Sequence, residues 1–272
     1  MTAPAKIRLD QYLALSGLVP SRERARALIL AGRILVNEQK IDKPGALVAS
    51  DAALRLLGEL PRYVSRGGLK LEHALRHWQI PLTDRDCLDI GTSTGGFTDC
   101  LLQHGARSVT CVDTGFGQIA ISLRSDPRVH LLERTNARLL AARSFARTSQ
   151  QNTPVPTLLV MDVSFISATL LLPAVLAAAP EVTEAVILVK PQFEVGRERI
   201  GKGGIVRDPA AHQFAVHRVT DCITELRATS VETTPSPITG AEGNVEFLLH
   251  ACFVSRGNAQ IDTHPASPTT PN

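Results

Sequence analysis

Four charged residues are placed where their side chains could do acid–base chemistry together. Lys190 ends the apolar stretch AVILVK, and Asp162 ends the apolar stretch LLVMD. Glu246 lies inside GNVEFLLH, and Lys70 lies in the first turns of a predicted helix, after a flexible glycine pair. A charge among apolar residues is costly unless it is compensated. Two cations and two anions gathered at a sheet edge can hold one another's ionisation states away from their solution values.

The use of lysine at position 190 is informative. The chain has 23 Arg and six Lys, so positive charge is generally supplied by Arg. Arginine would serve a salt bridge equally well here, whereas an amine can become neutral when it loses water. Lys190 is therefore a candidate general base. Taken singly, each of the four residues also has a structural explanation as a helix cap, a salt-bridge partner or a snorkelling lysine.

A glycine-rich turn follows the apolar run 87–90 and precedes a predicted helix. Three interpretations compete for it. Residues 91–95 match G-x-S-x-G, the turn that exposes a nucleophilic serine, here Ser93. A dinucleotide-binding loop fits loosely, because position 93 is not glycine. The third is the loop of adenosyl-methionine methyltransferases, in which backbone approaches a nucleoside that carries an amino acid.

The next predicted strand favours a nucleoside ligand. The stretch SVTCVD ends in Asp113, which follows Gly91 at the distance expected of a carboxylate that binds the ribose hydroxyls of adenosine. A hydrolase would also need an Asp and then a His downstream, and no His stands out as that partner. Ser93 is therefore interpreted as a hydrogen-bonding loop residue.

The elements that must position these groups alternate in type. We expect strands at 86–90, 108–113, 129–132, 157–161, 184–190 and 245–253, and helices at 96–104, 116–124, 167–179 and 208–227. This alternation predicts an α/β fold with a doubly wound parallel sheet. Ligands then bind at the carboxyl ends of the strands.

Residues 6–57 predict a separate small unit with two helices and a small sheet. The first quarter of the chain, residues 1–76, carries 13 Lys and Arg against 7 Asp and Glu, whereas the remainder carries 16 against 19. Such a basic part suits a module that binds a polyanion, or equally a solvated charged face. Arg22 and Arg26 lie one helical turn apart, so we expect them to share a face. The expected core positions are Leu9, Tyr12, Leu13, residues 15–18, Ala25, Leu28 and Ile29.

The chain divides into a small RNA-binding domain at 1–60, a larger domain at 61–257 and a polar, proline-rich tail at 258–272, which we expect to be disordered. Pro61 marks the linker, because the residue before a proline disfavours helix. The first residues lack an apolar signal region, and the longest apolar stretch, 168–180, is too short to span a bilayer. Five cysteines without C-x-x-C predict buried thiols and no disulfide framework or metal site. We therefore expect a cytoplasmic protein without membrane segments.

The first stretch resembles a known RNA-binding module. RLDQYLALSGLVPSRERARALILAGRILVNEQKI is similar to the small domain shared by a small-subunit ribosomal protein, pseudouridine synthases and some rRNA methyltransferases. Glu38 stands where that pattern commonly has glycine. The resemblance implies that structured RNA is the partner.

The whole arrangement resembles the TlyA family, hemolysin A-like proteins known as 2′-O-ribose rRNA methyltransferases with an FtsJ-type domain. The matching stretches are YVSRGGLKLEHAL, LDIGTSTGGFTDCLLQHGA, VDTGFGQIA, DPRVHLLERTNAR, MDVSFIS, LVKPQFEVGRE, GKGGIVRD and GNVEF. They run over roughly residues 6 to 256, with Thr92 and Thr114 in place of a common alanine and valine. The resemblance implies a Rossmann-like domain that uses S-adenosyl-L-methionine to methylate ribosomal RNA or ribosomal subunits, with cytidine as the expected base.

The resemblance also assigns roles to residues. Lys70, Asp162, Lys190 and Glu246 match the K-D-K-E catalytic tetrad, with Lys190 facing the ribose hydroxyl as its base. Asp162 would also border the sulfonium of the cofactor. The other implied cofactor residues are Asp89, Gly91, Ser93, Gly95, Gly96 and Phe97 around the methionine part, Asp113 at the ribose, and Asn136 near the adenine. The implied RNA-binding residues are Arg8, Arg22, Arg26, Arg33 and Arg66.

Three other functions compete with this interpretation. A pseudouridine synthase would need a catalytic Asp in R-L-D within a mostly antiparallel fold, and the one such string, residues 8–10, lies in the first predicted helix. A cytolysin would need a lytic helix, a secretion signal or a membrane segment. A ribosome-assembly factor with an inactive methyltransferase fold stays open, although the intact tetrad speaks against it. The sequence predicts no oligomeric state.

Overall fold

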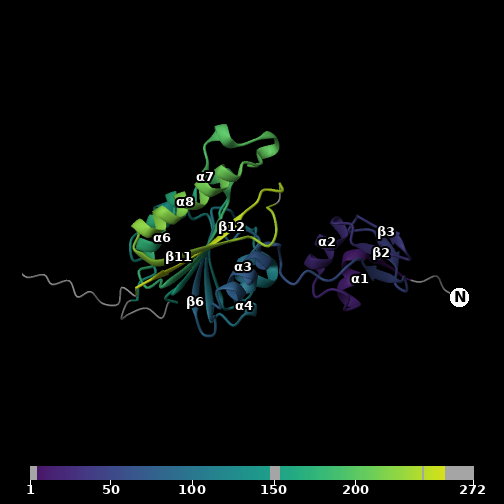
Figure 1. Ribbon diagram of the computed structural model, residues 1–272. Helices are drawn as coiled ribbons and strands as arrows, with labels where there is room; N and C mark the ends of the chain where they lie inside the picture. Colours follow the sequence, from purple (N-terminus) through teal and green to yellow (C-terminus); the bar gives the residue numbers. More distant parts are fainter. Residues whose placement is uncertain (1–4, 148–153, 241, 255–272) are drawn as a thin grey trace, which may run out of the picture.

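The computed structural model describes residues 5–147, 154–240 and 242–254, so the predicted tail at 258–272 lies outside the described part. The chain forms a small N-terminal unit and a larger unit built on one sheet, joined by an extended segment (Figure 1). None of the described helices is long and apolar enough to cross a membrane.

The small unit contains two helices and two small antiparallel sheets. Its elements are β1 (Lys6–Arg8), α1 (Leu9–Leu15), α2 (Arg22–Leu30), β2 (Ile34–Val36), β3 (Gln39–Lys40), β4 (Leu47–Ala49) and β5 (Leu54–Leu56). Strand β1 pairs with β4, and β2 lies between β3 and β5. Ser21 caps α2, because its side chain accepts a hydrogen bond from the backbone N–H of Arg24.

The core of the small unit confirms most of the predicted positions. Leu9 and Leu13 of α1 are buried against Ala25, Leu28 and Ile29 of α2. The prediction that residues 15–18 all face this core was wrong. Leu15 is 70% exposed, because α1 ends there and only one stripe of so short a helix can face inward.

The larger unit contains a seven-stranded sheet in the order β11-β12-β10-β9-β6-β7-β8. Its strands are β6 (Asp86–Ile90), β7 (Ser108–Val112), β8 (Val129–Leu132), β9 (Leu158–Met161), β10 (Glu184–Val189), β11 (Ala228–Pro235) and β12 (Phe247–Phe253). Five of these are parallel, whereas β12 runs antiparallel to β10, and β11 antiparallel to β12. The α/β class is confirmed, but the sheet is mixed and not entirely parallel.

The difference at this edge has a physical reason. Residues 236–246 join β11 to β12, and their described part contains no crossover helix of the kind that a parallel pair needs, so the two strands pair antiparallel. The sequence analysis missed β11, which has the sequence ATSVETTP. All of its residues are partly or fully exposed, and apolar and polar residues do not alternate along it as they do in a half-buried strand.

Helices cover both faces of this sheet. They are α3 (Gly67–His77), α4 (Gly96–Gln103), α5 (Ile121–Arg124), α6 (Leu172–Ala178), α7 (Pro191–Glu194) and α8 (Pro209–Glu225), with single 3₁₀ turns η1 (Ala137–Leu139), η2 (Ala168–Leu170), η3 (Arg197–Arg199) and η4 (Lys202–Gly204). α6 and α8 pack on one face and α3 and α4 on the other, so that each face has its own apolar core (Figure 1).

Three predicted helices differ in extent. The helix expected at 116–124 is only the four-residue α5, and the helix expected at 167–179 is divided into η2 and α6. Pro173 lies in the first turn of α6. Backbone N–H groups have no partner within the helix at this position, so the missing N–H of proline costs no hydrogen bond. Gly67 and Gly68, expected as a flexible pair before this helix, are the first two residues of α3.

The site is organised where the strand order reverses, between β6 and β9. Gly91 follows β6 with φ +84°, and a Cβ atom on it would lie 2.5 Å from the carbonyl oxygen of Asp162, which follows β9. The N–H of Asp162 donates to the carbonyl of Ile90 at 3.1 Å. The glycine therefore lets two strand ends meet backbone to backbone at the switch point of the sheet.

Candidate active site

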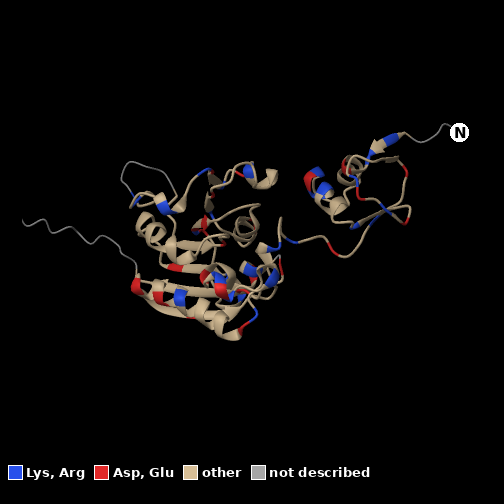
Figure 2. Ribbon diagram, turned by 90° about the horizontal axis from the view of Figure 1, so that it is seen from above, with Lys and Arg blue, Asp and Glu red and all other residues tan. Residues whose placement is uncertain are grey.

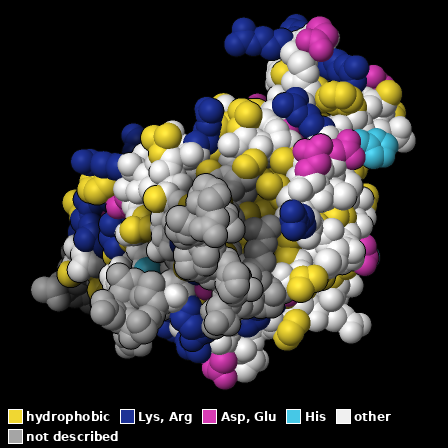
Figure 3. All heavy atoms as spheres, turned by 90° about the vertical axis from the view of Figure 1, so that its left-hand side faces the viewer, with side chains coloured by type: hydrophobic (Ala, Val, Ile, Leu, Met, Phe, Trp, Pro, Cys, Tyr) yellow, Lys and Arg dark blue, Asp and Glu magenta, His cyan; other side chains and the backbone are white. Residues whose placement is uncertain are grey.

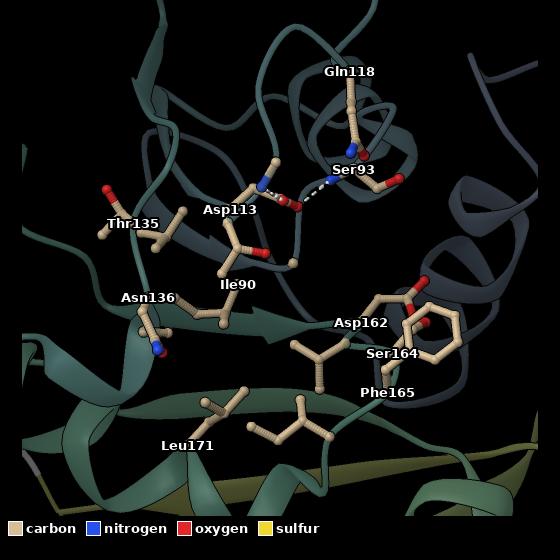
Figure 4. A pocket seen from close by; sticks show the side chains of 17 residues that line it. Ile90, Ser93, Asp113, Gln118, Thr135, Asn136, Asp162, Ser164, Phe165 and Leu171 are labelled. Atoms are coloured by element: carbon tan, nitrogen blue, oxygen red, sulfur yellow. Dashed lines mark hydrogen bonds between the residues drawn. The ribbon is translucent and has the colours of Figure 1, made fainter.

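A cavity of about 420 Å³ opens at the carboxyl ends of β6, β7 and β9 (Figure 4). Its walls combine apolar side chains, among them Ile90, Val112 and Leu171, with a few polar ones. The polar side chains are Ser93, Asp113, Thr114, Gln118, Thr135, Asn136, Asp162 and Ser164. Apolar walls with convergent polar groups are typical of a site for a small ligand.

Asp113 organises one end of this cavity. Its Oδ2 accepts a hydrogen bond from the N–H of Ser93 at 2.8 Å, and its Oδ1 accepts one from the N–H of Gly115 at 2.6 Å (Figure 4). The carboxylate thus holds together the loops that follow β6 and β7. Each oxygen keeps a lone pair for a ligand hydroxyl, because an ionised carboxylate offers about four acceptor positions.

A second cavity of about 220 Å³ lies next to the first. Gly91, Ser93, Asp162 and Ser164 line both cavities, so the two share a wall. The other lining residues of the second cavity are Ser65, Gly67, Lys70, Thr92, Thr94, Gly96, Phe97 and Lys190. The predicted reactive lysines therefore face a space that adjoins the larger cavity.

The structure brings the four predicted acid–base residues together as two ion pairs. The Lys190 amine lies 2.6 Å from Asp162 Oδ1 and donates to Ser164 Oγ at 2.8 Å. The amine of Lys70 contacts the carboxylate of Glu246, and both side chains are less than a tenth exposed. Glu246 does not line the second cavity, and its contact with the Lys70 amine connects it to that space. Breaking one partner of such a buried pair leaves an uncompensated charge.

The predicted cofactor residues divide into two groups. Gly91, Ser93, Asp113, Asn136 and Asp162 line the first cavity, and Gly96 and Phe97 line the second. Gly95 lines neither of them. It has φ +93°, and a Cβ atom on it would lie 2.4 Å from Leu123.

Asp89 was expected to line the site of the methionine part of the cofactor. Its side chain lies instead in the protein interior, under the loop that follows β6. Its side chain is fully buried, and its Oδ2 accepts a hydrogen bond from the Thr98 hydroxyl at 2.6 Å. Burial raises the pKa of Asp89 to about 7, because the lowering effect of Thr98 is smaller, and the charges of Asp162 and Asp113 raise it further. The side chain supports the start of α4 and meets neither cavity.

Four of the five predicted RNA-binding arginines are engaged by the protein itself. Arg8 and Arg22 both donate to the buried carboxylate of Asp10. Arg33 donates to the carbonyl of Leu57, and Arg66 donates to the carbonyl of Thr239 at 2.6 Å. Arg26 is exposed, and its guanidinium group has no hydrogen bond or ion pair among the described residues.

Arg22 therefore turns toward Asp10, whereas Arg26 is free to contact a partner. Basic segments are spread over both units (Figure 2), and the face drawn in Figure 3 shows separate groups of basic side chains without one dominant patch.

The sequence analysis missed two aromatic residues beside the site. Phe165 is 92% exposed, has φ +66°, and lies with its ring centroid 5.4 Å from that of Phe193. Phe165 lines the first cavity and follows Ser164, which lines both. An exposed ring at such a place is a surface on which a nucleobase can stack. The signal was available, because each phenylalanine follows a strand end that carries a reactive residue, Asp162 or Lys190.

A separate group of ligand-type side chains lies at the other end of the sheet. Glu184, His250 and Cys252 offer atoms within 4.8 Å of one another. Arg85 pairs with Glu184 at 2.5 Å, and His250 lies 2.7 Å from the same carboxylate. Glu184 begins β10 whereas Lys190 follows its end, so this ion-pair network stands apart from the two cavities.

Two family models match the chain. The S4 domain model matches residues 7–53, and the FtsJ-like methyltransferase model matches residues 63–253. The second match covers well over half of the chain and contains both cavities. The chain belongs to the FtsJ-like methyltransferase family.

Relatives extend this similarity over both units. The TlyA protein of Mycobacterium tuberculosis, named a 16S/23S rRNA (cytidine-2′-O)-methyltransferase, is 42% identical over 245 residues, which cover 90% of this chain and 89% of that one. Hemolysin A of Brachyspira hyodysenteriae is 38% identical over 90% of this chain and 99% of its own length. A solved structure from Streptococcus thermophilus, designated a hemolysin, has a TM-score of 0.66 at 40% identity and covers 93% of this chain and 90% of its own.

S-adenosyl-L-methionine is the methyl donor of this FtsJ-like methyltransferase, and the residues present fit it. Asp113 offers carboxylate oxygens for ribose hydroxyls at one end of the first cavity. Ile90, Val112 and Leu171 provide apolar walls for a flat ring. Asp162 lies where the two cavities meet, so that its negative charge complements a sulfonium.

The pKa values of Asp89 and Asp86 can be tested against each other. Both side chains are buried on β6, and their pKa values are shifted in opposite directions. Burial alone would raise the pKa of Asp86, but hydrogen bonds from Arg107, Ser108 and Val155 outweigh it and lower that pKa. The pKa of Asp89 rises instead from 3.8 to about 7. A raised pKa means that the stabilising contribution of Asp89 is lost as the pH rises through that interval.

We therefore expect Asp89→Asn to gain stability relative to the parent protein between about pH 4.5 and about pH 7.5, by up to about 4 kcal/mol. Asp86→Asn should show no such gain over this interval, because a lowered pKa gives a contribution that is fully present above the unfolded-state pKa of about 3.9 and is lost only below it. Urea unfolding of the three proteins at both pH values measures this. Parallel pH dependences for the two variants would contradict the assignment.

Proposed function

We propose that this protein transfers the methyl group of S-adenosyl-L-methionine to the ribose 2′-oxygen of a cytidine in ribosomal RNA. The observation that carries the proposal is the pair of ion pairs, Lys190–Asp162 and Lys70–Glu246, beside a cavity that fits a nucleoside. The printed names of relatives that match nine-tenths of the chain support ribosomal RNA and cytidine. The parallel centre of the sheet and the family match favour this activity over a pseudouridine synthase.

The reaction needs a base and alignment. A ribose hydroxyl is a weak nucleophile and must lose its proton as the new bond forms, and the cofactor supplies an activated methyl group on a sulfonium. Lys190 would accept that proton at Nζ. Asp162 and Ser164, which contact this amine at 2.6 and 2.8 Å, would hold it in position to receive the proton. In-line positioning supplies much of the remaining acceleration.

Lys70 and Glu246 would align the ribose. The Lys70 amine faces the second cavity and is held from behind by the Glu246 carboxylate, so it can donate to a ligand oxygen from a fixed direction. For the cofactor, we assign the ribose hydroxyls to Asp113, the neighbourhood of adenine to Asn136, and the methionine part to Gly91, Ser93, Gly96 and Phe97.

The small unit would bind RNA through its arginines. The S4 domain match at residues 7–53 and the methyltransferase match from residue 63 support a division of the chain near residue 60. Asp10 holds Arg8 and Arg22 in fixed positions, which suits contacts to phosphates, and Arg26 adds an unengaged charge. Because ribosomal RNA is the proposed substrate, we assign the protein to the cytoplasm.

Replacing Lys190 tests the proposed base. Lys190→Ala should lower kcat for methyl transfer to ribosomal RNA by about 100-fold or more, because general base catalysis contributes that much. Affinity for the cofactor should change little. The control is Lys202→Ala, an exposed lysine of the same unit, assayed with both substrates at saturation. Near-normal kcat in the Lys190 variant would remove Lys190 from this role.

Replacing Asp113 tests the cofactor assignment. Asp113→Asn removes one charged acceptor and sets an amide against the N–H of Ser93 or Gly115, so we expect the Kd for S-adenosyl-homocysteine to rise about 10- to 100-fold. Isothermal titration calorimetry measures this change. Asp126→Asn is the matched control, since Asp126 pairs with Arg128 at a distance from both cavities. Equal affinities in all three proteins would refute the assignment of Asp113.

Replacing Arg26 tests the RNA-binding face. We expect Arg26→Ala to weaken binding to ribosomal RNA and to reduce the slope of log K against log salt by about one, because one phosphate contact is lost. Arg55→Ala serves as the control, since Arg55 is paired with Glu38 in the same unit. The face is misassigned if the two variants have the same salt slope as the parent protein.

A further inference from the structure

Glu194 is a buried acid that the mechanism above does not use. It is the last residue of α7, four positions after Lys190, and it is 2% exposed. Its Oε2 accepts a hydrogen bond from Ser167 Oγ at 2.5 Å, and its Oε1 accepts one from the N–H of Ala168 at 2.8 Å. Both donors stand directly after the segment 162–166, which carries the partners of Lys190.

The strand ladder alone does not fix that segment against Lys190. The pairing of β9 with β10 runs from Leu158 opposite Glu184 to Met161 opposite Ile187. Asp162 and Lys190 both lie beyond the end of this ladder. Their relative position therefore depends on contacts between the loop after β9 and the turn after β10.

The loop after β9 also has a conformation that needs support. Phe165 has φ +66°, and an aromatic residue in this left-handed region is strained. Such a conformation persists when the surrounding structure over-determines it. The carboxylate of Glu194 supplies two charge-assisted hydrogen bonds at the far end of the loop, whereas Lys190 contacts its near end through Asp162 and Ser164.

Capping of the 3₁₀ turn η2 does not by itself account for Glu194. Ser167 already caps η2, because its Oγ accepts a hydrogen bond from the N–H of Thr169 at 3.2 Å. Burial raises the pKa of Glu194 against the lowering effects of Ser167, Ala168 and Arg218. Burying a carboxylate costs free energy, and Ser167 already caps the turn. We therefore infer a second role for Glu194.

Glu194 is also fixed from behind. Arg218 of α8 donates from Nη1 to the carbonyl oxygen of Glu194 at 2.8 Å. The backbone of Glu194 is thus tied to α8 while its side chain is tied to the start of η2. Glu194 thus connects the turn that carries Lys190, the loop that carries Asp162 and, through its backbone carbonyl, a long helix that packs on the sheet.

We propose that Glu194 is a positioning residue for methyl transfer, which fixes the loop 162–167 so that Asp162 and Ser164 meet the Lys190 amine. The inference rests on the proposed function of Lys190. It assigns Glu194 no contact with RNA or cofactor, and it predicts a loss of catalytic rate without a matching loss of binding.

Glu194→Gln tests this with little change of shape. The amide removes the negative charge, so neither hydrogen bond is charge-assisted, and the Ser167 hydroxyl must turn round to accept from the NH₂ group if Ala168 keeps its acceptor. We expect kcat to fall about 10- to 100-fold, because small displacements of catalytic groups have effects of this size. The KM for RNA and the Kd for S-adenosyl-homocysteine should stay within about threefold of the parent values, and the pH profile of kcat should shift because the surroundings of Lys190 change.

Two further variants separate positioning from a general effect. Glu198→Gln makes the same charge change at an exposed site in η3 and should behave like the parent protein. Ser167→Ala removes one of the two donors and should lower kcat in the same way but less. In the double variant, Ser167→Ala should lower kcat little beyond the effect of Glu194→Gln, since both changes break the same Ser167–Glu194 hydrogen bond. A kcat within about twofold of the parent in Glu194→Gln overturns the inference, as does an equal rise in KM and Kd.

A structural readout keeps this inference distinct from the proposed function. In a crystal structure of Glu194→Gln, we expect the Lys190 amine to lie farther from Asp162 than the 2.6 Å of the parent protein. If the parent protein transfers no methyl group to ribosomal RNA, the proposed function fails. The crystal structure of Glu194→Gln then still tests whether Glu194 fixes the position of the loop. An unchanged Lys190–Asp162 contact overturns the inference in either case.

Discussion

The site depends on the close approach of two strand ends, β6 and β9. Gly91 has φ +84° and no side chain, and any Cβ atom there would meet the backbone of Asp162 at 2.5 Å. This contact places the loop after β6 against the loop after β9 at the point where the strand order reverses. Gly91 and Asp162 line both cavities, so the larger cavity and the cavity that the lysines face adjoin because the two backbones touch.

Charge compensation is the second constraint. The centre holds two amines and two carboxylates with little access to water, and each charge has an opposite partner. Such pairs gain little stability over an apolar core, and their value lies in fixing where a proton or a positive charge can be accommodated. Residues outside the cavities complete this arrangement, since Glu246 holds Lys70 from behind and Glu194 holds the loop that carries Asp162.

The sequence predicted the positions of residues at the strand ends better than the contacts that support them. Asp113, Asp162 and Lys190 could be placed because each follows an apolar run, and parallel strands end at one edge. β11 was missed because an exposed edge strand lacks apolar alternation. Asp89 was expected in the ligand cavity, but its side chain points beneath the loop, and spacing along a strand end does not reveal that direction. Phe165 and Glu194 were also missed, because their roles depend on contacts between loops.

The most direct test of the account maps the product. Separated, unmodified small and large ribosomal subunits would be incubated with the protein and labelled S-adenosyl-L-methionine, and the label would be assigned by nuclease digestion and mass spectrometry. The account predicts label on the ribose 2′-oxygen of a cytidine. Label on a base, or no label on either subunit or on free ribosomal RNA despite measured cofactor binding, would contradict it.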